Sequence, residues 1–156
     1  MNVLITMIGR SVWGLVNSSW ASMRQFDYVP DRVHIITSMA NGEDTSKAAA
    51  SLRVVLHAFG SHAEIFIEPV VGGDIGSVST MVRELLERYR ERGDRIAIDV
   101  TSGTKDLVLG SIANDLSGVD HIFYLRIDSL RNADRPYILI PVERQQIIDV
   151  FEEVRP

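Results

Sequence analysis

The residues best suited to chemistry stand in two short turns built from glycine and hydroxyl side chains. The longer turn covers residues 101–105 (TSGTK), and the shorter covers residues 9–11 (GRS). The longer turn follows an apolar run at 96–100 with the length and β-branched content of a buried strand, and a helix-length apolar segment comes after it. Unpaired backbone N–H groups and the positive end of the helix dipole make such a helix start a natural seat for an anion.

The hydroxyl residues of the 101–105 turn allow two interpretations. Serine and threonine commonly cap helices, and capping alone would account for Thr101, Ser102 and Thr104. Capping would leave Lys105 unexplained, because a lysine in a first helical turn is unfavourable unless an anion or a carboxylate compensates it. The order of strand, turn and helix therefore favours an anion site.

Asp99 lies inside the apolar run that precedes this turn. Three roles are open for it: it orients the N–H groups of the turn, it pairs with a lysine or an arginine, or it is a buried acid with satisfied hydrogen bonds. The sequence does not distinguish among these roles.

The elements that must position the turns alternate along the chain. Apolar runs predict strands over 3–8, 33–37, 63–67, 96–100, 121–127 and 137–140. Helical spacing predicts helices over 15–26, from Asp44 or Thr45 to Gly60, over 78–89 and from Lys105 onward. This order predicts a single α/β domain, a Rossmann-like three-layer sandwich with a mostly parallel six-stranded sheet. The last two strands form a C-terminal antiparallel hairpin, and 142–156 form a short C-terminal helix or tail.

Ligands of parallel sheets bind outside the carboxyl ends of the strands, near the point where the strand order reverses. Four turns are predicted to lie at that edge: 9–11, Ser38-Met39, Gly72-Gly73 and 101–105. Their convergence predicts a ligand site there.

Composition excludes several classes of protein. A net charge of −5 argues against coating of duplex nucleic acid by bulk basicity, although it permits a local positive pocket. The chain has no cysteine and its four histidines are scattered, so no metal site and no cofactor are expected. Neither GxxxxGK[ST] nor GxGxxG is present. No apolar run reaches the roughly 20 residues of a membrane span, and a cytoplasmic protein is the expectation.

Residues 99–105 (DVTSGTK) resemble the second motif of the CARF family, the CRISPR-associated Rossmann fold domains. That motif reads much like D-x-T-G-G-T-K and follows the fourth strand, and here Ser102 replaces its usual first glycine. The family's first motif is a glycine-and-serine turn after strand one, where this chain has Ile8-Gly9-Arg10-Ser11-Val12-Trp13. The strand count and the final hairpin also fit, so the resemblance covers essentially the whole chain.

The resemblance implies a two-fold homodimer that binds a cyclic oligoadenylate, most often cyclic tetra-adenylate, in a cleft across the dimer axis. Lys105 and backbone N–H groups would then neutralise phosphates, and Arg10 would pair with phosphate or stack on adenine. Trp13 would stack on a base, or else it belongs to the core. The residues expected to bind the ligand are Gly9, Arg10, Ser11, Trp13, Ser38, Met39, Gly73, Thr101, Ser102, Gly103, Thr104 and Lys105.

The usual CARF protein carries an effector domain, and only about fifteen residues follow Pro141 here. The resemblance therefore points first to a ring nuclease, which cleaves the cyclic messenger without a metal by attack of a ribose 2′-OH on the adjacent phosphorus. Lys105 would stabilise charge on the transition state and Ser11 would position the phosphate. Two alternatives stay open: a sensor module that binds without cleaving, and an α/β domain for another phosphorylated ligand such as a mononucleotide. The helix after Lys105, which contains Gly110, is expected near the subunit interface.

Overall fold

Strands and helices alternate along most of the chain in its computed structural model, which describes residues 1–9, 11–38, 42–71 and 74–154. The first half contains β1 (Asn2–Ile8), α1 (Val12–Phe26), β2 (Arg32–Thr37), α2 (Glu43–Ala58), β3 (Glu64–Pro69) and α3 (Ile75–Glu91). The second half contains β4 (Arg95–Asp99), α4 (Lys105–Ile112), β5 (His121–Ile127), the 3-10 turns η1 (Leu130–Asn132), η2 (Tyr137–Leu139) and η3 (Val142–Arg144), β6 (Gln145–Asp149) and α5 (Val150–Val154).

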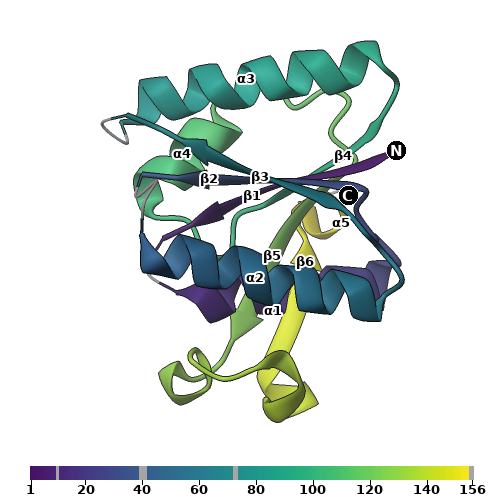
Figure 1. The fold of residues 1–156 in the computed structure, drawn as a ribbon, viewed down its shortest axis with the longest axis vertical. Helices are drawn as coiled ribbons and strands as arrows, with labels where there is room; N and C mark the ends of the chain where they lie inside the picture. The colour runs from purple at the N-terminus through teal and green to yellow at the C-terminus, as the bar shows by residue number, and fades with distance from the viewer. Residues whose placement is uncertain (10, 39–41, 72–73, 155–156) are drawn as a thin grey trace.

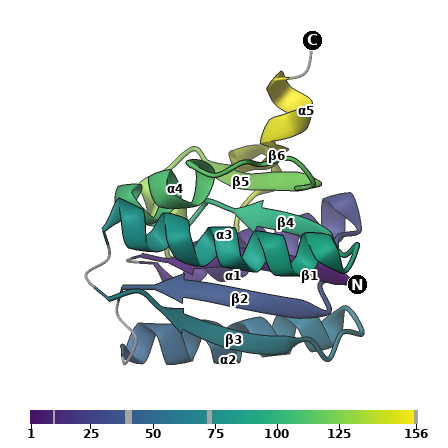
Figure 2. The same cartoon turned by 90° about the horizontal axis from the view of Figure 1, so that it is seen from above.

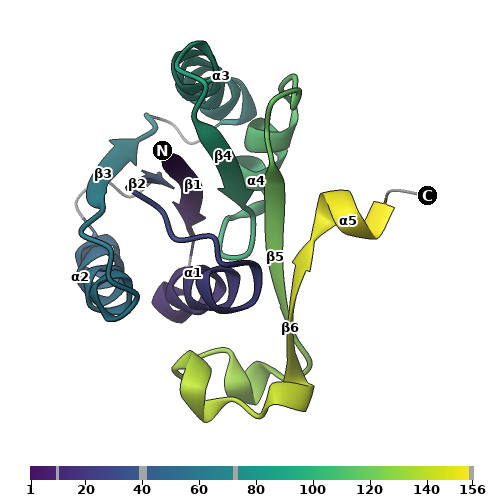
Figure 3. The same ribbon diagram turned by 90° about the vertical axis from the view of Figure 1, so that its right-hand side faces the viewer.

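The strands form one sheet in the order β3-β2-β1-β4-β5-β6, which Figure 2 shows from above. All neighbours are parallel except β5 and β6, which are antiparallel. Helices α1 and α2 cover one face, and α3 and α4 cover the other (Figures 1 and 3). The predicted α/β class, with a mostly parallel sheet and a final antiparallel pair, is confirmed. The order reverses between β1 and β4, so the switch point lies between these two central strands.

The core explains why the central strands read as unbroken apolar runs. Leu4 and Ile8 of β1 pack in the cluster beneath α1 and α2, whereas Ile5 and Met7 pack in the cluster beneath α3 and α4. Successive side chains of a strand point to opposite faces, and both faces of this sheet are covered.

Gly110 allows α3 and α4 to approach closely. A Cβ atom added there would lie 2.6 Å from Cβ of Val78 and 2.8 Å from the carbonyl oxygen of Ile75. Glycine in a helix is about 1 kcal/mol less favourable than alanine, and the close packing of α3 on α4 compensates for this cost. The opposite side of α4 is open in a single chain, since Leu109 is 49% and Ile112 is 38% exposed.

The predicted sixth strand at 137–140 is wrong, because these residues form η2 and the strand is Gln145–Asp149. Pro136 and Pro141 flank the segment, and a proline cannot donate to a strand ladder. The predicted terminal helix or tail is also corrected, because strand β6 lies within 142–156 and α5 begins only at Val150.

Three helix starts differ from the prediction. Helix α1 begins at Val12 rather than at residue 15, because the side chain of Ser11 caps it. Gly42, rather than Asp44 or Thr45, is the N-cap residue of α2 and makes no side-chain cap bond. Helix α3 begins at Ile75 rather than at 78, since the Asp74 carboxylate accepts from the N–H of Ser77.

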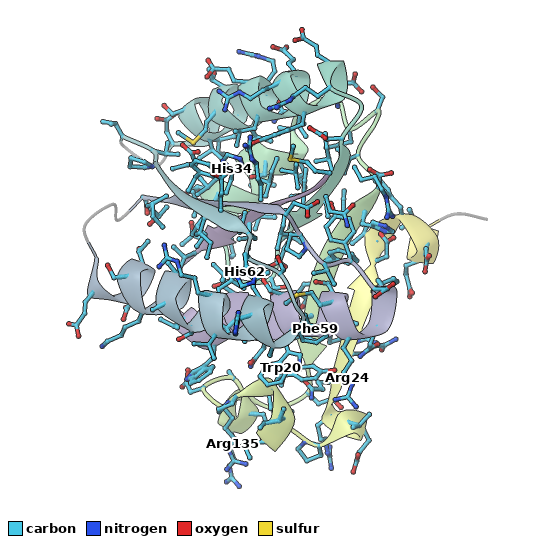
Figure 4. All side chains as sticks on the ribbon, turned by 45° about the vertical axis from the view of Figure 1, so that its right-hand side comes forward. Trp20, Arg24, His34, Phe59, His62 and Arg135 are labelled. Carbon is cyan, nitrogen blue, oxygen red and sulfur yellow. The ribbon has the colours of Figure 1, made fainter. Side chains whose placement is uncertain are left out.

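Residues 128–144, called here the β5–β6 excursion, fold back against α1 (Figure 3). The rings of Trp20 and Tyr137 stack at 5.7 Å between centroids, and Trp20 lies between α1 and the excursion in Figure 4. Nδ2 of Asn17 donates to the carbonyl of Arg135 at 2.7 Å, and Nε2 of Gln25 donates to the Tyr137 hydroxyl at 3.2 Å. The excursion is therefore attached to α1 around Arg135 and Tyr137.

Asp99, at the end of β4, ties the central elements together. Oδ2 of this fully buried carboxylate accepts from the hydroxyls of Thr6 on β1 and Ser18 on α1, at 2.9 and 2.6 Å. Oδ1 accepts from the N–H and the hydroxyl of Thr101, at 3.0 and 2.6 Å. The same hydroxyl accepts from the N–H of Leu125 on β5 at 2.9 Å. Asp99 is thus a satisfied buried acid that also orients the turn, and among the described residues no lysine or arginine pairs with it.

Burial raises the pKa of Asp99, and the hydrogen bonds from Ser18, Thr101 and Thr6 oppose that rise. The folded protein therefore binds this proton more readily than the unfolded chain does. The contribution of Asp99 to stability is fully present below the ordinary value of 3.8 and is lost as the pH rises through the raised folded-state pKa.

Asp99→Asn removes this titration while keeping the shape of the side chain. We expect the free energy of unfolding of the wild type, minus that of Asp99→Asn, to decrease as the pH rises from about 4. Urea denaturation at a series of pH values measures it. If the difference in unfolding free energy between wild type and Asp99→Asn grew with pH, the raised pKa of Asp99 would be contradicted, because the hydrogen-bond donors would then outweigh the effect of burial.

Asp99→Ala should lower the free energy of unfolding by about 3 kcal/mol, since it leaves buried donors unpaired.

Candidate functional site

A cleft of about 640 Å³ opens at the carboxyl ends of the central strands. Its lining comprises Ser11, Gly14, Thr101, Ser102, Gly103, Thr104, Lys105, Tyr124, Leu125, Ile127 and Ala133. The cleft therefore brings the end of the first turn together with the whole of the 101–105 turn, as the sequence predicts for the switch point between β1 and β4.

The two turns are locked together by their backbones. The N–H of Gly9 donates to the carbonyl of Ser102 at 2.8 Å, and the Ser102 hydroxyl donates to the carbonyl of Ser11 at 2.8 Å. A Cβ atom at position 9 would lie 2.5 Å from the Ser102 oxygen, so only glycine permits this approach. Gly9 and Ser102 thus act on the cleft by holding its shape.

Some hydroxyl groups of the two turns are occupied by hydrogen bonds within the protein, and others can still donate to a ligand. Thr101 donates to Asp99 and accepts from the N–H of Leu125, so its hydroxyl is occupied within the protein. The Ser11 oxygen accepts from the N–H of Gly14 at 3.1 Å and caps α1. The proton of the Ser11 hydroxyl has no acceptor in the described part of the chain, and it remains for a ligand.

Thr104 and Lys105 form the open end of the cleft. Thr104 is the N-cap residue of α4, yet its side chain makes no cap bond, so first-turn N–H groups of α4 lack a side-chain partner. Both side chains are exposed, and within the described ranges no carboxylate lies in ion-pair distance of the Lys105 ammonium. The capping interpretation is therefore wrong for Thr104 at the start of α4. Asp106 lies in the same first turn as Lys105, but no ion pair of Lys105 occurs among the described residues, so this helix start offers an unpaired cation and N–H donors, which suit an anion.

A second hollow, of about 400 Å³, lies on the other side of Ser11. It is lined by Ser11, Val12, Trp13, Lys47, Ser51 and Asp134. Trp13 is half-buried: it packs against the core cluster of α1 and α2 and also faces this hollow. The core interpretation of Trp13 is therefore confirmed, and stacking on a base stays a prediction for its surface toward the hollow.

The remaining predicted residues are not brought into the cleft. Ser38 is exposed after β2 and lines neither hollow. Arg10, Met39 and Gly73 lie outside the described residues. Placing Ser38 at the correct sheet edge was thus insufficient, because β2 lies on the far side of β1 from β4.

Sequence reasoning missed lining residues from two sources. Tyr124, Leu125 and Ile127 enter because β5 is the neighbour of β4, and strand adjacency was a usable signal. Ala133 and Asp134 enter through the β5–β6 excursion, whose folding onto α1 depends on Trp20 and Tyr137 pairing across the chain. No local sequence pattern predicts that pairing.

Another hollow, of about 480 Å³, lies between α2 and the loop that leads to the edge strand β3, with Arg53, His57 and His62 in its lining. The two histidine rings are 5.1 Å apart. In the portion of the chain that the structure describes, no group of three or more potential metal ligands occurs. Likewise, no described helix is long and apolar enough to cross a membrane.

Comparison with known proteins gives matches by structure and none by sequence. No family model matches the chain, and no curated protein does. Csm6 from Enterococcus italicus, solved with cyclic hexa-2′-fluoro-hexa-dAMP bound, matches 98% of this chain and 42% of its own, at 16% identity and a TM-score of 0.62. A type III CRISPR defence DNA nuclease activated by cyclic oligoadenylate matches 81% of this chain and 19% of its own, at 17% identity and a TM-score of 0.58.

The chain spans less than half the length of either structural neighbour. At these identities the likeness concerns the fold alone. Together with the strand order and the final antiparallel pair, it shows that this chain has a Rossmann-like fold of the CARF type.

Proposed function

We propose that this chain binds a cyclic oligoadenylate, most readily cyclic tetra-adenylate, as part of type III CRISPR antiviral signalling. The observation that carries the proposal is Lys105 at the start of α4, which makes no ion pair with any described residue and lines a cleft at the switch point of the sheet. Two proteins of similar fold support it, one solved with a cyclic hexanucleotide analogue and one activated by cyclic oligoadenylate.

The chemistry of the cleft suits a phosphodiester rather than a terminal phosphate. Lys105, the Ser11 hydroxyl and the N–H groups that begin α4 supply one charge and several donors. In the described lining of the cleft, one cation matches the single charge of a phosphodiester. Leu125 and Ile127 give the lining an apolar part that suits ribose and base.

A two-fold homodimer would place two such clefts around one ring. The exposed apolar side of α4 lies beside the cleft: Leu109 is 49%, Ile112 is 38% and Tyr124 of β5 is 42% exposed. Burying these side chains against their copies would remove apolar surface from water. A cyclic ligand with two-fold symmetry suits two identical half-sites.

Cleavage would follow from the same geometry. The ribose 2′-oxygen attacks the adjacent phosphorus, the bond from phosphorus to the 5′-oxygen breaks, and the proton passes from the 2′-oxygen to the leaving 5′-oxygen through solvent. The products are a 2′,3′-cyclic phosphate and a 5′-hydroxyl. Lys105 stabilises the negative charge on the phosphorane-like transition state, and Ser11 orients the phosphate. No histidine lines the described cleft, so we expect slow turnover.

A sensor that binds without cleaving is the second candidate. It is favoured by the lengths of the neighbours, since the chain matches only 19% of a nuclease that cyclic oligoadenylate activates. In such a protein this fold would transmit binding to another part of the chain or to a partner.

Lys105→Ala tests the phosphate site. We expect it to weaken binding of cyclic tetra-adenylate by at least about a hundredfold, because two copies of the lysine act on each ring and a charged hydrogen bond is worth about 1.5–3 kcal/mol. Unfolding free energy should change by less than about 1 kcal/mol. Fluorescence anisotropy with a labelled ring measures the affinity, and Arg83→Ala on the exposed side of α3 is the matched control. Equal affinity of wild type and Lys105→Ala would refute the site.

Incubation with cyclic tetra-adenylate in EDTA tests cleavage. With ring in excess over protein, we expect linear products ending in a 2′,3′-cyclic phosphate over hours, and slower conversion by Ser11→Ala. Liquid chromatography with mass detection follows both species. Tight binding with the ring still intact would favour the sensor, and binding of a mononucleotide but of no cyclic tri-, tetra- or hexa-adenylate would favour another nucleotide ligand.

Leu109→Glu tests the dimer. A carboxylate on the apolar side of α4 would be buried at the interface, so we expect a folded monomer with weaker ring binding. Analytical ultracentrifugation measures the mass. Val54→Glu, which replaces a side chain on α2 that is 71% exposed, is the matched control. A wild type that is monomeric with and without the ring would contradict the dimer.

A further inference from the structure

The second hollow adjoins the cleft but takes no part in the phosphate chemistry described above. Ser11 lines both spaces, and the consecutive residues Ala133 and Asp134 line one each. The two spaces therefore meet along both α1 and the β5–β6 excursion. Ser11 is therefore the boundary that a ligand group attached to a phosphate in the cleft would have to cross to enter the hollow.

The hollow contains an unpaired carboxylate. Asp134 is exposed, and its carboxylate makes no hydrogen bond or ion pair with any described residue. Lys47, the cation of the same hollow, is already paired with Glu43, with its Nζ 2.7 Å from Oε1. An ionised carboxylate accepts hydrogen bonds and donates none, so the hollow presents a site for a ligand N–H donor.

Asp134 is held in place by its neighbours in the chain. The carbonyl of Arg135 accepts from Asn17 on α1 at 2.7 Å, and Tyr137 stacks on Trp20. Figure 4 shows the side chain of Arg135 on the outside of the excursion, away from α1. The backbone around Asp134 is thus fixed to α1 before any ligand binds, which lowers the entropy cost of recognition.

We propose that this hollow is the base subsite of the ligand and that it selects adenine through Asp134. The 6-amino group of adenine donates to the carboxylate, and Trp13 provides an aromatic surface against which the base packs. Hypoxanthine and guanine carry an oxygen at that position, which would face the carboxylate without a proton between them. This inference rests on the proposed function, since it assigns the base of the same ligand.

The test compares cyclic tetra-adenylate with cyclic tetra-inosinate, which differ in the group at position 6 and in the proton that only hypoxanthine carries on N1. We expect the wild type to prefer the adenylate ring by about tenfold or more. Asp134→Asn can donate as well as accept, and it should reduce the preference to about twofold or less. Glu143→Gln makes the same change of charge in the excursion outside both hollows, and it should keep the wild-type preference.

Each outcome bears on one claim or the other. If the wild type prefers adenylate and Asp134→Asn does not, with unchanged thermal midpoints, the base subsite is supported. If Asp134→Asn binds adenylate and keeps the full preference, the base subsite is wrong while the proposed function stands. If the wild type binds neither ring, both claims fail. Lys105→Ala separates the two sites, since it should weaken both rings equally.

Discussion

The hydrogen bonds to the Asp99 carboxylate are the constraint on which the rest of the site depends. They join β1, α1 and the 101–105 turn, and the hydroxyl of Thr101 extends them to β5. A carboxylate buried without a cation is costly, and here four bonds from three residues compensate it. The turn that carries Lys105 is therefore fixed from beneath by a fully buried carboxylate.

This arrangement separates holding from binding. Gly9, Thr101 and Ser102 make hydrogen bonds within the protein that hold the two turns in place. Ser11 and Lys105 line the cleft, and the Ser11 proton and the Lys105 ammonium remain available for a ligand. Residues of similar type in these turns thus occupy two kinds of position: the first kind holds the shape of the cleft, and the second kind offers groups to a ligand. Substitutions of the first kind would change the shape of the cleft, and those of the second kind would change its chemistry.

The sequence predicted the sheet and the main turn because both depend on local patterns. Apolar runs marked β1 to β5, and the strand-turn-helix order marked residues 101–105. It failed at 137–140, where an apolar run between two prolines packs Tyr137 on Trp20 instead of joining the sheet. Asp134 was missed for the same reason, because its place beside Trp13 depends on a contact between distant parts of the chain.

The central claim is that one cyclic oligoadenylate is held between two copies of this chain, and the stoichiometry of binding tests it most directly. Titration calorimetry of the purified protein with cyclic tetra-adenylate should give one ring for every two chains, since each ring would occupy two half-sites. One ring per chain would contradict the shared cleft. Absence of any heat or binding with cyclic tri-, tetra- and hexa-adenylate would contradict the ligand itself.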